Sequence, residues 1–267
     1  MINKQRRMIA VLAVCILLFA AASHVFARAP ANTPAVDQAK GPKLSPKVLV
    51  EGAALGAESN GITFGPDGNL YIASVFHSYI SVMDPSNGKI IYRYTADDNV
   101  YMPDDLVFGP DGSLYWTEII HGNVARMTPD GEITKQFVSM GTNPIAFSSD
   151  GRLFAGLCFF GDGLYELDPE LIAPPRPIIE ATPENPHPLG FLNAFSFGPD
   201  GRLYGPIFAG GMVVSVYVGE PGDLPSASPW TDGTIKVVAT GFSWPAAAKF
   251  GPDGHLYVID QAGECSR

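Results

Sequence analysis

Short apolar segments alternate with turn sequences along most of this chain, and the arrangement returns every 39–53 residues. A Gly-Pro-Asp-Gly sequence begins at Gly65, Gly109, Gly198 and Gly251, with a degenerate copy at Ser148. An aromatic residue precedes every copy, and a leucine followed by an aromatic residue comes two positions after it. Because proline presets the turn and Asp-Gly supplies a positive φ, each copy predicts a hairpin turn between two short strands.

Two further strands complete each repeat. In the first two repeats we expect them at 79–83, 89–94, 123–127 and 132–138, separated by further turn sequences. Four antiparallel strands per repeat indicate the blades of a β-propeller, because a β-solenoid has shorter repeats and a sandwich does not repeat so evenly. The predicted fold class is therefore all-β, and the 29 Gly and 24 Pro also argue against a helical bundle.

Five blades can be counted, and the fifth lacks its last strands before Arg267. A six-bladed ring at this period would need roughly 45–55 further residues, so we expect a six-bladed protein with a truncated C-terminus. The alternative is a natural five-bladed ring. In either ring, residues 47–51 could supply a closing strand.

The N-terminal segment has the order of a secretory signal, with three basic residues before an apolar run over residues 8–22. We expect a signal peptide over 1–27, a flexible linker over 28–45 and the propeller domain over 46–267. The apolar run is shorter than the roughly 20 residues that span a bilayer, which leaves an uncleaved anchor as the less favoured alternative. A periplasmic or secreted protein is therefore expected, with no integral membrane span after cleavage.

The charge of the chain limits its partners. Cleavage after Ala27 would remove three basic residues and no acids, so the net charge would change from −10 to −13 (−10 − 3). Such an acidic protein is disfavoured as a partner of nucleic acid or of anionic membrane surfaces. We expect a small-molecule substrate and no nucleic acid.

Polar side chains recur four positions before the aromatic residue that precedes each turn. This column contains Asn60, Asp104, Asn143, Asn193 and Ala246. The first strand of each propeller blade lines the central channel, so these residues should form a ring at one mouth. Their oxygens suit Ca²⁺ or another hard divalent cation, with Glu58 as a further candidate ligand. The alternative is that the column only caps strand ends by bonding nearby backbone.

The second strand of each blade should end at the same mouth. It brings Ser74, Glu118 and Asp260 there, with His77 and His121 three residues beyond the first two. The two histidines are candidate substrate contacts or solvated loop residues, and their spacing is not that of zinc ligands.

Aromatic residues also lie near this mouth in the alignment of the repeats. Trp116 and Phe160 are candidate substrate contacts that would favour an apolar or aromatic lactone, or else they belong to the core. Asp162, within a Gly-Asp-Gly sequence, is assigned to a turn.

Two segments, 60–71 and 103–108, resemble the inner strands of the senescence marker protein/gluconolactonase/luciferin-regenerating family. Members of that family are six-bladed propeller lactonases whose channel-mouth Glu, Asn and Asp bind one divalent metal. The matching positions here are Asn60, Asp104, Asn143 and Asn193. Asp105 departs from the pattern, because the family usually has Gly there, and Asn60 replaces a family Glu. Residues 109–137 are also similar to NHL repeats and to streptogramin lyase.

The resemblance implies a metal-dependent hydrolase of lactones or related esters, in which the metal polarises the carbonyl group. Asp104 is the expected general base, and Asp105 or Glu118 is the next choice. The alternative is a non-catalytic propeller that binds a ligand or a protein, favoured by the neutral Ala246 and the missing terminal blade. A streptogramin-type lyase using Glu118 and His121 is a third hypothesis.

Overall fold

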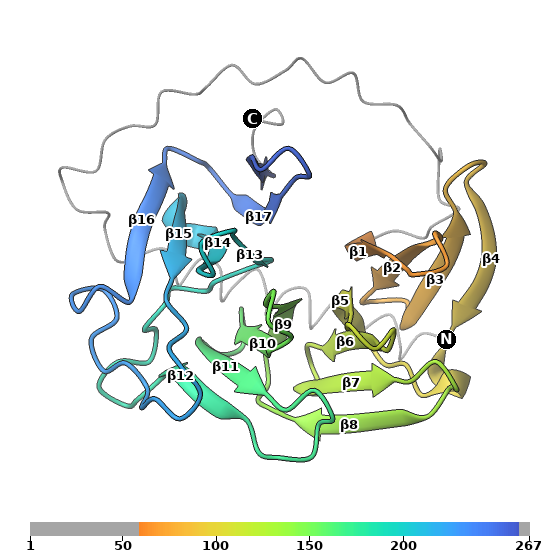
Figure 1. The fold of residues 1–267 in the computed structure, drawn as a ribbon, viewed down its shortest axis with the longest axis horizontal. Coiled ribbons are helices and arrows are strands. Elements are labelled where there is room, and N and C mark those ends of the chain that lie inside the picture. Colours follow the sequence, from red (N-terminus) through yellow and green to blue (C-terminus); the bar gives the residue numbers. More distant parts are fainter. Residues whose placement is uncertain (1–58, 262–267) are drawn as a thin grey trace, which may run out of the picture.

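The computed structural model describes residues 59–261 as five antiparallel sheets arranged around a common centre (Figure 1). The expected signal peptide and linker, the strand at 47–51, Glu58 and residues 262–267 lie outside the described residues. Within 59–261 there is no α-helix, and no helix is long and apolar enough to cross a membrane.

Four of the sheets have four strands each, hydrogen-bonded in chain order. The first sheet contains β1 (Ser59–Phe64), β2 (Leu70–Ser74), β3 (Tyr79–Asp84) and β4 (Lys89–Tyr94), and the second contains β5 (Pro103–Phe108), β6 (Leu114–Glu118), β7 (Asn123–Met127) and β8 (Ile133–Phe137). The third contains β9 (Thr142–Phe147), β10 (Leu153–Leu157), β11 (Gly163–Leu167) and β12 (Arg176–Glu180). The fourth contains β13 (Ser196–Phe197), β14 (Leu203–Ile207), β15 (Met212–Val216) and β16 (Ile235–Thr240). In the fifth sheet β17 (Pro245–Phe250) pairs with β18 (Leu256–Asp260). The expected strands of the first two repeats match β3, β4, β7 and β8 to within one residue at either end.

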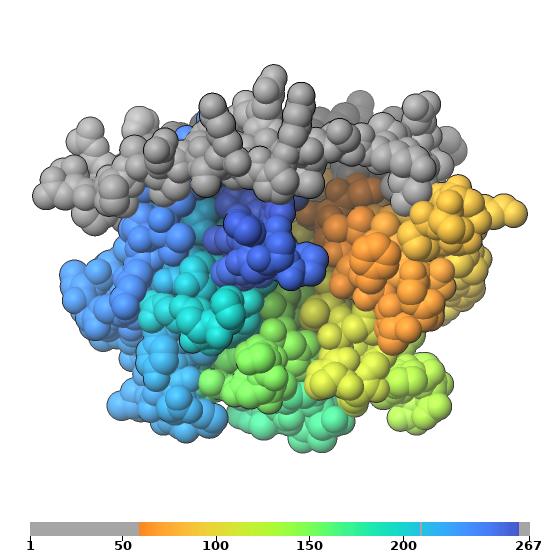
Figure 2. Space-filling view, turned by 45° about the horizontal axis from the view of Figure 1, so that its top comes forward, coloured from red at the N-terminus to blue at the C-terminus, as the bar shows by residue number. Residues whose placement is uncertain are grey.

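The sheets are the blades of a propeller. Figure 1 shows β1, β5, β9, β13 and β17 around the centre, with β4, β8, β12 and β16 at the periphery. Figure 2 shows the blades following one another in chain order. The all-β propeller of four-stranded blades is thus confirmed.

The repeated tetrapeptide acts together with the aromatic residue that follows it. The closing Gly68 has a φ of 78°, as the turn requires. The Asp67 carboxylate accepts hydrogen bonds from the main-chain N–H of Asn69, at 3.1 Å, and from the Tyr71 hydroxyl, at 3.3 Å. A Cβ on the opening Gly65 would lie 2.6 Å from the Tyr71 ring. The motif therefore fixes both the turn and the position of the tyrosine ring.

The aromatic residues of the motif pack across the junctions between blades. The ring that follows the leucine in one blade contacts the ring that precedes the turn in the next blade, with centroids 4.9–5.1 Å apart. The pairs are Tyr71–Phe108, Tyr115–Phe147, Phe154–Phe197 and Tyr204–Phe250. Such pairs contribute about 0.5–1.5 kcal/mol each beyond the burial of their area, so every described junction contains the same stabilising contact.

Apolar side chains fill the space between blades. Ala73 and Ile80 of the first blade pack with Leu106 and Trp116 of the second, and Trp116 is fully buried there. Burying a side chain of this size contributes about 1.5–3 kcal/mol or more, which holds the blades at fixed angles around the channel.

Candidate functional site

Three of the candidate ligands lie where the inner strands depart from regular pairing. The register with the second strand shifts at Asn60 of β1, Asp104 of β5 and Asn143 of β9, and also at Ala246 of β17. A β-bulge of this kind re-aims a side chain, which turns these three candidate ligands toward the channel. In three blades the residue two positions before the ligand is left-handed, with φ of 45° at Met102, 95° at Gly141 and 69° at Phe191. The chain thus turns sharply into each of these inner strands.

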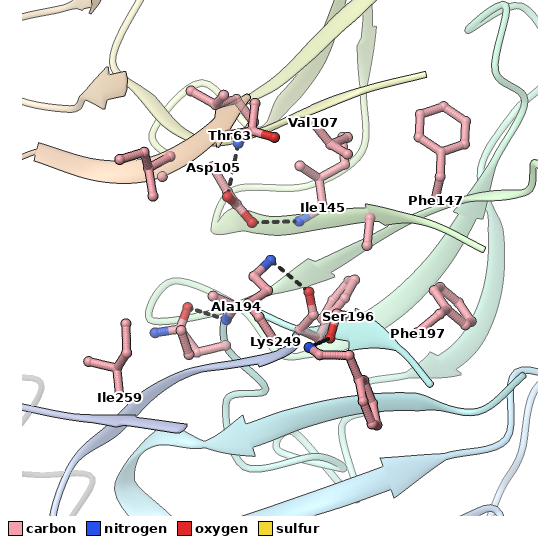
Figure 3. A pocket seen from close by; sticks show the side chains of 18 of the residues that line it. Thr63, Asp105, Val107, Ile145, Phe147, Ala194, Ser196, Phe197, Lys249 and Ile259 are labelled. Carbon is pink, nitrogen blue, oxygen red and sulfur yellow. Dashed lines mark hydrogen bonds between the residues drawn. The ribbon is translucent and has the colours of Figure 1, made fainter. Parts of the chain in front are cut away.

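One cavity of about 920 Å³ runs along the inner strands. Its lining contains the whole column, namely Asn60, Asp104, Asn143, Asn193 and Ala246, together with Asp105. It also reaches Pro199 and Pro252 of the turns at the opposite end, so it is the bore of the propeller (Figure 3). The structure therefore brings the four polar column residues around one space, and their binding of a metal stays a prediction.

Asp104 is the buried acid of this group. It is 4% exposed, and its Oδ1 accepts a hydrogen bond from Asn60 Nδ2 at 2.7 Å. Burial, and then the neighbouring Asp105 carboxylate, raises the pKa of Asp104 to about 8. A carboxylate in this environment is stabilised by a cation, because a positive charge offsets the cost of burying a negative one.

The contact between Asn60 and Asp104 depends on a glycine. A Cβ on Gly61 would lie 2.7 Å from Asp105 Cα and 2.8 Å from the carbonyl oxygen of Asp104. β1 and β5 can approach this closely only because residue 61 has no side chain.

Asp105 connects the second and third blades. Its Oδ1 accepts from the main-chain N–H of Leu106 at 2.9 Å, and its Oδ2 accepts from that of Ile145 at 3.2 Å (Figure 3). Thr117 makes a second link, because its hydroxyl accepts from the N–H of Asp105 at 3.0 Å and donates to the carbonyl of Asn143 at 2.7 Å. The expected alternative base thus lines the cavity while both of its oxygens bind main-chain N–H groups.

The chemistry of the ligand set fits a hard cation. Asn143 and Asn193 are 4% and 9% exposed, and with Asn60 and Asp104 they offer one carboxylate and three amide groups. Asn193 Oδ1 also accepts from the N–H of Ala194 at 2.9 Å. Over residues 59–261 no group of three or more His, Cys, Asp or Glu side chains could hold a metal. A cation here would therefore depend on amide oxygens.

Glu118 lies apart from the residues that line the cavity. Pro103 of β5 pairs with Glu118 of β6, so the second strand does return to the mouth as expected. The Glu118 carboxylate, however, forms an ion pair with Lys135 and accepts from Asn123 Nδ2 at 3.0 Å. It also accepts from the main-chain N–H of Tyr101, at 3.3 Å, on the loop that leads into β5. These contacts fix the edge of the second blade.

The four expected substrate contacts also lie outside the described lining of the cavity. Trp116 is fully buried between blades, and Phe160 is half-buried in the loop before β11. His77 is exposed, with Nδ1 3.4 Å from the Ser74 hydroxyl oxygen. His121 is exposed beside the ring of Tyr101. Trp116 therefore belongs to the core, which was the alternative for the aromatic residues, and contact with a substrate stays a prediction for Phe160, His77 and His121.

The assignment of Asp162 to a local turn is wrong. Its carboxylate is 1% exposed and accepts main-chain N–H groups of the loop that leads into the fourth blade, from Leu189 at 2.9 Å and Gly190 at 2.7 Å. Burial raises the pKa of Asp162 to about 6 although these donors oppose the shift. The sequence could not reveal this link, because the partners lie 27 and 28 residues away.

Comparison with solved structures places this fold among known propellers. A gluconolactonase from Xanthomonas campestris has a TM-score of 0.59 at 17% identity, over 77% of this chain and 70% of that one. A streptogramin B lyase has a TM-score of 0.58 at 16% identity, over 76% of this chain and 62% of the lyase. A chain of a nidogen–laminin complex has a TM-score of 0.58 at 16% identity, over 76% of this chain and 72% of that one.

No protein-family model and no curated protein matches the sequence. The property that this chain shares with these solved structures is the fold. The expected likeness to gluconolactonase propellers, with features of streptogramin lyase and NHL-type propellers, is confirmed at that level. Because the match spans less than two thirds of the streptogramin B lyase chain, activity, substrate and partners are matters for proposal.

Proposed function

We propose that this protein is an exported, metal-dependent hydrolase of lactones or related esters that acts at the channel mouth. The observation that carries this proposal is the buried Asp104 carboxylate, with a pKa raised to about 8, among the side-chain amides of Asn60, Asn143 and Asn193. The fold likeness to gluconolactonase supports the reaction class.

The residues have complementary roles. Ca²⁺ held by Asn60, Asn143, Asn193 and Asp104 would polarise the lactone carbonyl and stabilise the developing negative charge. Asp104 takes a proton from the attacking water and returns it to the alkoxide released when the ring opens. Bound Ca²⁺ would favour the ionised form of Asp104, which is the form that can accept this proton. Asn60 Nδ2 holds Oδ1 of the carboxylate, which leaves Oδ2 for the proton.

The test uses the full chain with a panel of aliphatic and aryl lactones, in Ca²⁺ and in chelator. We expect chelator-sensitive turnover, and a loss of about 10²–10⁴-fold in kcat for Asp104→Asn. Asp200→Asn, an exposed turn residue at the other end of the channel, is the matched control and should retain full activity. Turnover that is insensitive to chelator, or unchanged in Asp104→Asn, would refute the hydrolase.

The same experiment distinguishes two other functions. Terbium luminescence that reports a bound cation, without turnover of any lactone, would indicate a non-catalytic propeller, for which the neutral Ala246 in the fifth blade is the supporting feature. Release of an elimination product from a cyclic ester, with loss in His121→Ala, would indicate a streptogramin-type lyase.

A further inference from the structure

A lysine lies inside the channel, away from the ring of candidate ligands. Lys249 is the one basic residue among the described residues that line the cavity. It stands on β17 three residues after Ala246, so it lies about 10 Å deeper in the channel at roughly 3.3 Å per residue. Its side chain is solvent-exposed and points into the bore (Figure 3).

The ammonium group of Lys249 has more N–H donors than its one hydrogen bond to the protein uses. Lys249 Nζ donates to the main-chain carbonyl of Phe195 at 2.7 Å, which holds the side chain beside the residue that precedes β13. A lysine has three N–H donors, so two remain for a ligand. The nearby Ser196 hydroxyl already donates to the carbonyl of Ala248 at 3.1 Å and accepts from the N–H of Phe250 at 3.2 Å.

The other walls at this depth are largely apolar. Val107, Ile145 and Phe197 line the same cavity, and Figure 3 shows them around the bore. A positive charge beside apolar walls interacts more strongly with an anion than it would in open water. The two acids in the lining have other partners among the described residues: Asp105 accepts from main-chain N–H groups and Asp104 accepts from Asn60.

We propose that Lys249 binds an anionic group, a carboxylate, on the ligand that enters the channel. The ligand class is then a lactone or ester with a carboxylate-bearing chain that reaches about 10 Å from the reacting carbonyl. The ligand class rests on the proposed function, whereas the anion site does not. Since no other basic side chain among the described residues lines the cavity, Lys249 is the group that would attract an anion there.

The anion site is tested without turnover. Glutarate, titrated calorimetrically into the full chain in chelator, should bind, and Lys249→Met should weaken it about tenfold to hundredfold, as expected for the loss of a charge-assisted hydrogen bond. Lys249→Arg should retain most of the affinity. Lys89→Met, an exposed lysine on β4, is the matched control. Equal glutarate affinity in Lys249→Met and the unaltered protein would overturn the site.

The ligand class is tested with a matched pair of substrates. A γ-lactone with a terminal carboxylate on its side chain should have a lower KM than its methyl ester, and Lys249→Met should remove that preference. Because the ratio compares two substrates on one protein, a general loss of stability does not change it. If neither lactone turns over while glutarate binding still depends on Lys249, the hydrolase is refuted and the anion site stands. If both turn over equally in the unaltered protein, the ligand class is refuted.

Discussion

Replacing Asp104 with asparagine should stabilise the metal-free protein at and above neutral pH. The substitution keeps the size of the side chain and an oxygen that accepts from Asn60, and it removes the charge. Burial raises the pKa of Asp104 to about 8, whereas the unfolded chain titrates near 3.9. The folded protein therefore binds this proton more tightly. The resulting stability is complete below about pH 4 and is lost as the pH rises through 8.

The magnitude follows from the two pKa values. A difference of about four pK units, at about 1.4 kcal/mol each, corresponds to roughly 6 kcal/mol between acid and alkaline pH. Water in the channel and the amide of Asn60 screen part of this charge, so we expect about 2–4 kcal/mol to be measurable. Urea denaturation in chelator at pH 5, 7 and 9 should show the unaltered protein losing this much free energy of unfolding relative to Asp104→Asn.

Two comparisons make the experiment decisive. Asp200→Asn removes an exposed acid from a turn and should follow the pH profile of the unaltered protein. Ca²⁺ favours the ionised form of Asp104, so it should restore stability to the unaltered protein above neutral pH and leave Asp104→Asn unchanged. Parallel profiles for the unaltered protein and Asp104→Asn would show that this carboxylate is not destabilised by its burial.

Three further substitutions test how the ring around the channel is held. Thr117→Val should cost about 1–3 kcal/mol in urea denaturation, because the N–H of Asp105 and the carbonyl of Asn143 both lose their buried partner. Gly61→Ala should weaken terbium binding at least tenfold, since its Cβ would lie 2.7 Å from Asp105 Cα and push β1 from β5. Asp162→Ala should cost about 2–4 kcal/mol and expose the loop leading into the fourth blade to limited proteolysis, because its main-chain donors lose their acceptor.

The fold could be predicted because each repeat contains the information for its own blade. Asp67 and Tyr71 bond to each other within one turn, and Tyr71 then packs on Phe108 of the next blade. Both interactions repeat at a fixed spacing, so they leave a regular trace in the sequence. The sequence did not show that the ring after the leucine in one blade contacts the ring before the turn in the next blade, because the two residues of each pair belong to different repeats.

The candidate site was predicted only in outline, for a reason of strand geometry. The column of Asn60, Asp104 and Asn143 is regular in sequence, and the structure places it around one cavity. The bulges that turn these side chains to the channel leave no sequence signal here, although a shift of one residue exchanges the two faces of a strand. Lys249 was missed because it stands outside the column, in a blade whose column residue is Ala246.

The two adjacent acids show why side-chain chemistry alone could not assign the base. In the sequence Asp104 is preferred to Asp105 only by its place in the column and by the family resemblance, because both are carboxylates expected at one channel mouth. In the structure Asp105 accepts hydrogen bonds from main-chain N–H groups of two blades, at 2.9 and 3.2 Å, which occupy both of its oxygens. Asp104 accepts from one side-chain amide, and burial raises its pKa to about 8. Asp105, which joins the blades, is thus poorly suited to accept a proton, whereas Asp104 is suited to do so. The proposed chemistry is therefore assigned to Asp104.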